Sequence, residues 1–321
     1  MKNKKHLTKI FIILAVAIAG LSYVLFPRFT EEQRKLSEML SDIRADIIFD
    51  SNRSGTFGIH IFSHNNLTVR PLYDSPMHEI NPDASPDGRY VVFAKGKSAE
   101  RGRYFDIWIV ERDGSGAREL AKNGAYPTFH NDGKKVIFER GHRTILSVDV
   151  STGKETILFD TQGTPFEGHQ VFLPRLSPDG KSVAVTSTKG TRYTNYVIQL
   201  DNIEFYGIGK GCEPFWTQSG EEIFWITDID AKHLTKVMKY DVAKKTNEEV
   251  LDNSEPRGID YFPVVPADNK YLLFSSGAKR RDYLKGDYQV FLRNLETSET
   301  LTITNDTFNN RWPKFLKIPQ E

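Results

Sequence analysis

The amino-acid sequence predicts an all-β protein, a six-bladed β-propeller of four-stranded blades, preceded by one N-terminal transmembrane helix. Three observations lead to this prediction. Short apolar runs alternate with turn residues from about residue 46, a proline-led pattern recurs along the chain, and a 17-residue apolar run follows four lysines. Repeats of roughly 40–50 residues with about four strands each are typical of propellers.

The composition is that of a folded protein without a strong charge bias. The 321 residues include 43 Lys and Arg against 42 Asp and Glu, and 12% are aromatic. A dedicated nucleic-acid-binding domain usually carries a marked basic excess, so nucleic acid is not an expected partner. The single cysteine, Cys212, excludes an internal disulfide and any site built from several cysteines.

The N-terminus has the pattern of a membrane-targeting segment. Residues 10–26 are apolar and follow a basic tail, residues 1–9. A cleaved signal peptide, cut after residues 17–19, is one interpretation; we favour a retained signal anchor because the apolar run continues beyond that point. The basic tail then stays in the cytoplasm, and the rest of the chain is held at the inner membrane, in the periplasm or outside the cell.

A short helical stalk is expected over residues 27–45. Thr30 and Gln33 form a capping-box pattern, and apolar residues follow at helical spacing. The apolar residues are Leu36, Met39, Leu40 and Ile43. This stripe could pack on the domain that follows, or it could join two copies of the chain.

A proline-led pattern repeats through the remaining residues, 46–321. Each repeat contains a proline, a turn five or six residues later, and then a strand. The repeats are residues 81–93, 126–138, 173–185, 213–225 and 262–274, with a sixth proline at Pro313. Proline is expected to open the innermost strand, where no partner needs its missing N–H, and Asp-Gly pairs such as Asp87-Gly88 are expected to form the following turn.

The two ends of the repeat array complement each other. Residues 47–72 read as outer strands without a proline-led inner strand, and residues 312–316 read as an inner strand without a blade. Pairing the C-terminal strand with the first blade would close the ring and remove its open edges.

The repeat also resembles a known family. Segments such as LPRLSPDGKSVAV, together with the strand DIWIV and its DGSGARELA tail, are similar to the TolB-type WD-like (WD40-like) propeller repeat. The resemblance covers about residues 46–316 and implies the six-bladed fold, without the extra N-terminal α/β domain of TolB. Members range from periplasmic envelope scaffolds to propeller domains of prolyl peptidases, so it implies little about activity.

A candidate site is expected where the inner strands begin. Residues close before the prolines should line a central funnel, and polar groups that converge in a concavity are the usual starting hypothesis for a site. They are Glu79, Asn81, Tyr126, His169, Glu213, Asp260 and Arg311. These side chains could equally satisfy one another along the channel wall. A cation held by Glu79, His169, Glu213 and Asp260 is a lesser alternative that no ligand spacing supports.

The loops that join the second and third strands of the blades are basic. Together with Arg53 they contain fourteen basic and six acidic residues, while the whole chain is nearly neutral. Such a rim attracts anionic partners, and Tyr193 among the charges suits sugars or protein side chains. The proposed rim residues are Lys95, Arg101, Arg103, Lys189, Arg192, Arg280, Arg281 and Lys285. Ordinary solvated loops are the alternative.

No motif in the sequence points to catalysis. The chain lacks a G-x-S-x-G elbow, a P-loop and a G-x-G-x-x-G loop, so no catalytic residue, cofactor or metal is predicted. The favoured hypothesis is a non-catalytic, membrane-tethered propeller that binds an envelope protein or an anionic glycan. The alternative is a polysaccharide lyase or hydrolase in the funnel, with His169 as base and Arg311 or a metal neutralising a uronate.

Overall fold

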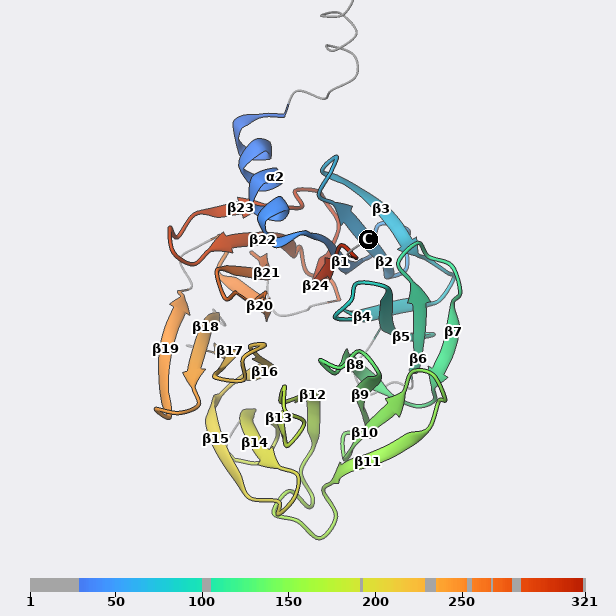
Figure 1. The fold of residues 1–321 in the computed structure, drawn as a ribbon, viewed down its shortest axis with the longest axis vertical. Coiled ribbons are helices and arrows are strands. Elements are labelled where there is room, and N and C mark those ends of the chain that lie inside the picture. The colour runs from blue at the N-terminus through green and yellow to red at the C-terminus, as the bar shows by residue number, and fades with distance from the viewer. Residues whose placement is uncertain are drawn as a thin grey trace, which may run out of the picture.

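The computed structural model describes residues 29–99, 105–190, 193–228, 235–252, 256–266, 268–278 and 284–319. Within these ranges, one helix precedes twenty-four strands. The strands form six four-stranded antiparallel sheets, arranged as blades around a central axis (Figure 1). The predicted six-bladed propeller is confirmed.

The blades are numbered in chain order, each from its inner to its outer strand. Blade 1 comprises β24 (Asn310–Lys317), β1 (Ala45–Ser51), β2 (Gly58–Ser63) and β3 (Thr68–Tyr73). Blade 2 comprises β4 (His78–Ala84), β5 (Tyr90–Gly96), β6 (Asp106–Glu111) and β7 (Arg118–Ala121). Blade 3 comprises β8 (Ala125–Phe129), β9 (Lys135–Arg140), β10 (Thr144–Asp149) and β11 (Glu155–Asp160).

The second half of the ring follows the same order. Blade 4 comprises β12 (Val171–Leu176), β13 (Ser182–Ser187), β14 (Thr194–Gln199) and β15 (Phe205–Lys210). Blade 5 comprises β16 (Cys212–Trp216), β17 (Glu222–Asp228), β18 (Thr235–Asp241) and β19 (Thr246–Leu251). Blade 6 comprises β20 (Ile259–Val264), β21 (Tyr271–Gly277), β22 (Gln289–Asn294) and β23 (Thr300–Thr302).

The chain ends meet in blade 1, as predicted. Strand β24 pairs antiparallel with β1, with Ile47 opposite Phe315. Blade 2 supports this joint, because the Arg112 side chain donates a hydrogen bond to the Lys317 carbonyl at 2.8 Å and pairs with the Asp46 carboxylate. The ring is therefore closed by contacts from both sides of the joining strand.

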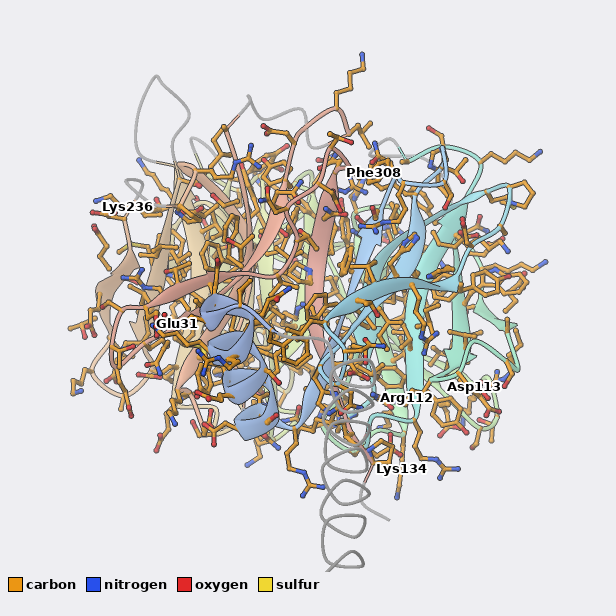
Figure 2. All side chains as sticks on the ribbon, turned by 90° about the horizontal axis from the view of Figure 1, so that it is seen from above. Glu31, Arg112, Asp113, Lys134, Lys236 and Phe308 are labelled. Carbon is orange, nitrogen blue, oxygen red and sulfur yellow. The ribbon has the colours of Figure 1, made fainter. Side chains whose placement is uncertain are left out.

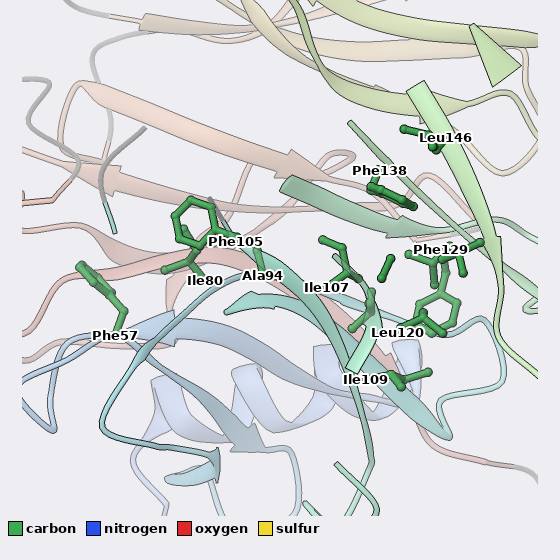
Figure 3. Close-up of a cluster of buried hydrophobic side chains, with 14 of the residues drawn as sticks. Phe57, Ile80, Ala94, Phe105, Ile107, Ile109, Leu120, Phe129, Phe138 and Leu146 are labelled. Atoms are coloured by element: carbon green, nitrogen blue, oxygen red, sulfur yellow. The ribbon is translucent and has the colours of Figure 1, made fainter. Parts of the chain in front are cut away.

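The hydrophobic core lies between neighbouring blades. Figure 3 shows one such cluster, in which Ile107 and Ile109 of blade 2 lie near Phe138 and Leu146 of blade 3. All four side chains are at most 3% exposed. Successive side chains of a strand point to opposite faces of its sheet, so each blade presents an apolar layer to the blade on either side. Burial of these layers means that each blade is stabilised by both of its neighbours.

The predicted Asp-Gly turns are structural. Gly88 has a φ of 71°, and a Cβ placed there would stand 1.9 Å from the Lys317 carbonyl oxygen. The Asp87 carboxylate accepts hydrogen bonds from the Ser85 hydroxyl and the Arg89 N–H. Glycine is required here both for the left-handed turn and for the close approach of the joining strand.

The two faces of the ring can be told apart by their connections. We call the face with the loops between second and third strands the loop face, and the face with the tight hairpins the turn face. In Figure 2, Phe308 and Lys236 mark the loop face, whereas Asp113 and Lys134 mark the turn face. The inner strands run from the loop face towards the turn face.

Helix α2 (Glu31–Ile43) lies against the outside of the ring beside β23 (Figures 1 and 2). Its capping box between Thr30 and Gln33 is present. Its buried residues Leu36, Met39 and Leu40 join a cluster with apolar side chains of blades 1 and 6. The apolar stripe therefore packs on the propeller itself. The Asp42 carboxylate adds a polar contact, because it accepts a hydrogen bond from the Lys270 ammonium at 2.8 Å.

The predicted basic tail, residues 1–9, and signal anchor, residues 10–26, lie outside the described residues. In the ranges that the structure describes, no helix has the length and apolar character needed to cross a membrane.

Candidate functional site

Each inner strand has the same backbone irregularity at its proline. The residue before the proline has a φ between 52° and 62°, although none of the six is glycine. A register shift accompanies it in every blade, which makes each a β-bulge. The six residues are Asn81, Tyr126, Leu173, Glu213, Phe262 and Trp312. Such backbone is costly for non-glycine residues, and its sixfold repetition marks a constraint imposed by the ring.

The prediction that the prolines open the inner strands is wrong, because they lie inside these strands, at the bulges. Pro82 lies inside β4 and Pro263 lies inside β20, rather than at the start of the inner strand. A bulge leaves one residue out of the hydrogen-bonded ladder, so the missing N–H of proline is tolerated in mid-strand.

Aromatic side chains fill the middle of the channel. One buried cluster contains Tyr126, Leu173, Phe262 and Trp312 from the bulges, together with Phe172. The ring centroids of Phe262 and Trp312 are 4.1 Å apart, and those of Tyr126 and Trp312 are 5.9 Å apart. We call this cluster the axial plug, because its members come from blades on different sides of the axis.

The plug was largely missed by the sequence analysis, which expected a polar funnel. Tyr126 was included among the candidates, whereas Leu173, Phe262 and Trp312 were not. The signal was present, since each of these residues directly precedes a repeat proline. The prediction of a polar funnel uses only the polar residues near the prolines.

Arg311 is locked in an ion pair on the loop-face side of the plug. Its guanidinium donates to the two carboxylate oxygens of Asp50 at 2.8 and 3.2 Å, and both residues are at most 1% exposed. The guanidinium also lies over the Phe57 ring, 3.7 Å from its centroid. The backbone N–H of Asn81 donates to Asp50 at 3.1 Å, so this group ties blade 1 to blade 2.

Glu79 and Lys95 face each other in the interior. The buried Glu79 carboxylate accepts a hydrogen bond from the Ser75 hydroxyl, and the Lys95 ammonium stands 3.7 Å away. Lys95 also donates to the Tyr73 hydroxyl at 2.9 Å. Burial raises the pKa of Glu79 to about 7. Lys95 thus belongs to the blade interior and not to the solvent-facing rim.

Asp260 is a fully buried acid whose carboxylate oxygens have no hydrogen bond of good geometry among the described residues, although the nearby Ser276 hydroxyl partly offsets the effect of burial on its pKa. Its backbone is held by Thr235, whose hydroxyl accepts from the Asp260 N–H at 2.6 Å. Burial raises the pKa of Asp260 to about 7. The side chain is therefore an acid that can be neutral in the folded protein at physiological pH.

Glu213 and His169 occupy different surroundings. Glu213 accepts from the Phe262 N–H at 2.7 Å, and its own N–H donates to the Thr186 hydroxyl at 3.2 Å, so it links blades 4, 5 and 6. His169 is half-buried in the loop before β12, where its N–H donates to the Phe166 carbonyl. In the described part of the chain, no group of three or more His, Cys, Asp or Glu side chains is placed to hold a metal.

The predicted basic rim is only partly described. Arg101, Arg103, Arg192, Arg280 and Arg281 lie outside the described residues. The half-buried Lys189 donates to the Pro165 carbonyl at 2.8 Å, and Lys285 is exposed on the loop face. Among the residues that the structure describes, two aromatic side chains are exposed on that face, Tyr193 by 44% and Phe308 by 37%.

A small concavity that the sequence analysis does not predict lies on the turn-face side of the plug. The space around its lining is about 240 Å³ including open solvent, and the enclosed part holds about one water molecule. Its lining includes Leu173, Phe215, Phe262 and Trp312, two prolines, Glu213, and the basic side chains of Arg175 and Lys314. We call it the axial cavity. Arg175 and Lys314 each follow a repeat proline directly.

These features define a six-bladed β-propeller whose axis is filled by an aromatic plug with charged groups on both sides. The same fold is found in TolB. The chain superposes on TolB from Acinetobacter baumannii with a TM-score of 0.66, at 15% identity over 86% of this chain and 68% of that one. The corresponding values for a putative TolB from Agrobacterium tumefaciens are 0.58, 15%, 86% and 99%. The TolB-type propeller fold expected from the repeat is thus confirmed.

The fold is shared more widely. A chain of the nidogen/laminin complex gives a TM-score of 0.60 at 10% identity, covering 85% of this chain and 98% of that one. No protein-family model matches the sequence, and no curated protein matches it significantly. Likeness at this level of identity concerns the fold, and function has to be argued from the site.

Proposed function

We propose that this chain is a non-catalytic binding propeller of the cell envelope, tethered to the inner membrane, that recognises an anionic glycan or protein partner with its loop face. The observation that carries the proposal is the pairing of exposed aromatic side chains with basic residues on that face. Tyr193 and Phe308 are exposed there, and the Arg53 guanidinium lies 5.3 Å from the centroid of the Phe308 ring. Aromatic and arginine side chains dominate binding hot spots.

The charge of the loops supports an anionic partner. The loop set carries a basic excess although the chain is nearly neutral, so the field is polarised towards one face. Some of the described basic residues are neutralised by acids of the protein itself. Arg140 pairs with both carboxylate oxygens of Glu155 at 2.8 Å, and Arg53 pairs with Asp306 at 3.0 Å. In this proposal the partner is bound mainly by the basic residues that the sequence places in the loops around residues 101–103 and 279–285.

The paired state of the funnel residues favours binding over hydrolysis. The alternative enzyme needs Arg311 or a metal to neutralise a uronate, and the Arg311 guanidinium already holds both oxygens of Asp50. Releasing it would leave a buried carboxylate without its partner, which costs about 3–5 kcal/mol. His169 lies in a loop with no described contact to that pair.

The test compares two charge-reversal variants of equal size. R101E/R103E/R280E/R281E changes the loop face, and K134E/K154E/K181E/K245E changes exposed turns on the opposite face. We expect the first to weaken binding to immobilised polygalacturonate and capture of partners from native membranes at least tenfold, and the second to bind like wild type. Equal losses in both variants, with circular dichroism unchanged, would refute recognition by the loop face.

The same polysaccharide tests the alternative. Incubation of wild type and His169→Ala with polygalacturonate, followed by the ultraviolet absorbance of unsaturated products and by reducing-end assays, should show no turnover by either protein. Turnover that depends on His169 would replace the binding proposal. The membrane tether is tested separately, by fractionation and protease accessibility of the full chain against a chain lacking residues 1–28.

A further inference from the structure

The six loop-face connections between second and third strands differ in length. The connection in blade 3 has three residues, 141–143, whereas every other blade has at least six. Gly141 and His142 have φ values of 64° and 54°, and the Arg143 N–H donates to the Arg140 carbonyl at 3.3 Å, which closes a tight turn. Blade 3 therefore adds the least chain to this side of the channel mouth.

Tyr193, at the start of β14 in the neighbouring blade 4, is a fixed aromatic platform. Its side chain is 44% exposed. Its ring stands at 81° to the buried Phe172 ring, with the centroids 5.3 Å apart, so at least one face of the Tyr193 ring is not covered by Phe172. The Tyr193 carbonyl accepts from the Gly211 N–H at 2.8 Å. A ring that is already held in place loses little conformational freedom when a ligand stacks on it.

His142 packs on the same aromatic residue from blade 3. Its ring centroid is 6.0 Å from that of Phe172, so His142 and Tyr193 flank one buried ring. The His142 Nδ1 stands 3.0 Å from the buried Glu139 carboxylate, which also accepts the His142 backbone N–H at 2.6 Å. A quarter of the His142 side chain is exposed, so the pair presents a polar wall beside the platform.

Gln170 connects the two positions. The Val171 N–H donates to the His142 carbonyl at 2.8 Å, and the Gln170 N–H donates to the Thr188 hydroxyl at 2.9 Å. Thr188 begins the connection that ends at Tyr193. The exposed Gln170 side chain therefore belongs to the same strip of the loop face as the platform and its wall.

The surroundings of Tyr193 favour a sugar ring over a protein side chain. The other large apolar side chains that are exposed, among those described, are Ile157 on the outer strand of blade 3 and Phe308 before β24, across the ring in blade 1 (Figure 1). Tyr193 is thus not part of a contiguous apolar patch, which the core of a protein interface requires. A single aromatic ring among hydrogen-bonding groups matches a sugar, whose C–H groups pack on the ring while its hydroxyl groups bond to the neighbours.

We propose that Tyr193 and Gln170, with the wall formed by His142, are a subsite for one sugar unit of a uronate glycan. The sugar ring stacks on Tyr193, and its hydroxyl groups bond to Gln170. The inference rests on the proposed loop-face function and gives the glycan a place at the edge of the channel mouth. The basic residues attract the carboxylates of such a chain, whereas this subsite recognises the ring itself, so the two contributions depend differently on the charge of the glycan.

The experiment compares binding of polygalacturonate with binding of its methyl-esterified form, which keeps the sugar rings and loses the charge. Tyr193→Ala should weaken binding of both polymers by a similar factor, about fivefold, with an unchanged melting temperature. Tyr193→Phe should keep most of the binding, because it keeps the ring, and Gln170→Ala should weaken both polymers less than Tyr193→Ala does. The control Ile157→Ala, an exposed apolar residue away from the mouth, should bind like wild type.

The charge-reversal variant R101E/R103E/R280E/R281E separates this inference from the proposed function, because it should lose affinity for the charged polymer only. If it does so while Tyr193→Ala binds like wild type, the subsite is refuted and the loop-face proposal stands. If Tyr193→Ala weakens both polymers and charge reversal has no effect, the basic loops are refuted and the subsite stands. Wild-type protein that binds only the charged polymer, or neither polymer, would overturn the subsite.

Discussion

Arg311 and Lys314 stand three residues apart on strand β24, and both are withdrawn from water, with 1% and 4% of their surface exposed. On the loop-face side of the axial plug, Arg311 is neutralised by Asp50 through two hydrogen bonds. On the turn-face side, Lys314 meets an aromatic ring and a cavity. The comparison shows that burial of a cation does not by itself identify a site. The two cations differ in whether the fold supplies the counter-charge, and this difference decides how each affects stability.

The largest expected effect comes from breaking the neutralised pair. Asp50→Ala leaves the Arg311 guanidinium buried without its anion and removes the acceptor of the Asn81 N–H. We expect the free energy of unfolding to fall by about 3–5 kcal/mol, measured by urea denaturation. The double variant D50A/R311M should recover part of this loss, because it removes the uncompensated charge as well. A double variant no more stable than D50A would show that the pair contributes through packing alone.

Substitution of Lys314 is expected to raise the free energy of unfolding, whereas substitution of Asp50 lowers it. Burial lowers the pKa of Lys314 to about 7 in the folded chain, from an ordinary value of 10.5, so between these limits the folded chain binds fewer protons than the unfolded chain. Stability should therefore rise with pH from about 7 to about 10. Lys314→Met should abolish this rise and increase the unfolding free energy at pH 7 by about 2–3 kcal/mol. A destabilised Lys314→Met would mean that the ammonium has a neutralising partner after all.

The sequence was sufficient to predict the ring because the fold repeats. Six prolines at spacings of 40–50 residues and a C-terminal WPKF without a blade of its own determine the blade number and the closure. The stripe Leu36, Met39 and Leu40 was recognised by its helical spacing. Each of these patterns is formed by residues close together in the sequence. The proline pattern is repeated, and the C-terminal inner strand is matched by the incomplete first blade.

The interior of the channel could not be predicted in the same way. Whether the side chain at Phe262 or Trp312 points to the axis depends on a bulge, which strand alternation does not reveal. Whether a charged residue is neutralised depends on residues from other blades. Lys95 appeared to belong to a solvent-facing rim, yet it is held by Glu79 and Tyr73 in the interior. Lys314 is absent from the predicted site, because its distance from the acids Asp83 and Glu213 depends on how several blades pack together.

Asp260 is a buried acid on the loop-face side that forms no ion pair among the described residues, and it gives the smallest of the expected effects. Its folded pKa of about 7 exceeds the ordinary value of 3.8, so between these limits the folded chain binds more protons than the unfolded chain. Stability should fall as the pH rises from about 4 to 7. Glu79, whose pKa is also raised to about 7, acts in the same direction. With Lys314 acting above this range, these groups together predict a stability minimum near pH 7.

The Asp260 contribution can be isolated by substitution. Asp260→Asn keeps the size of the side chain and removes its charge, and should raise the unfolding free energy at pH 8 by about 1–2 kcal/mol while leaving it nearly unchanged at pH 4. Thermal unfolding across this pH range, with the exposed control Asp268→Asn, measures the difference. An equal effect of Asp260→Asn at both pH values would attribute it to packing rather than to the buried charge. A destabilisation confined to pH 8 would instead mean that the carboxylate is held ionised by a bound cation, and the contrast with the paired Arg311 would disappear.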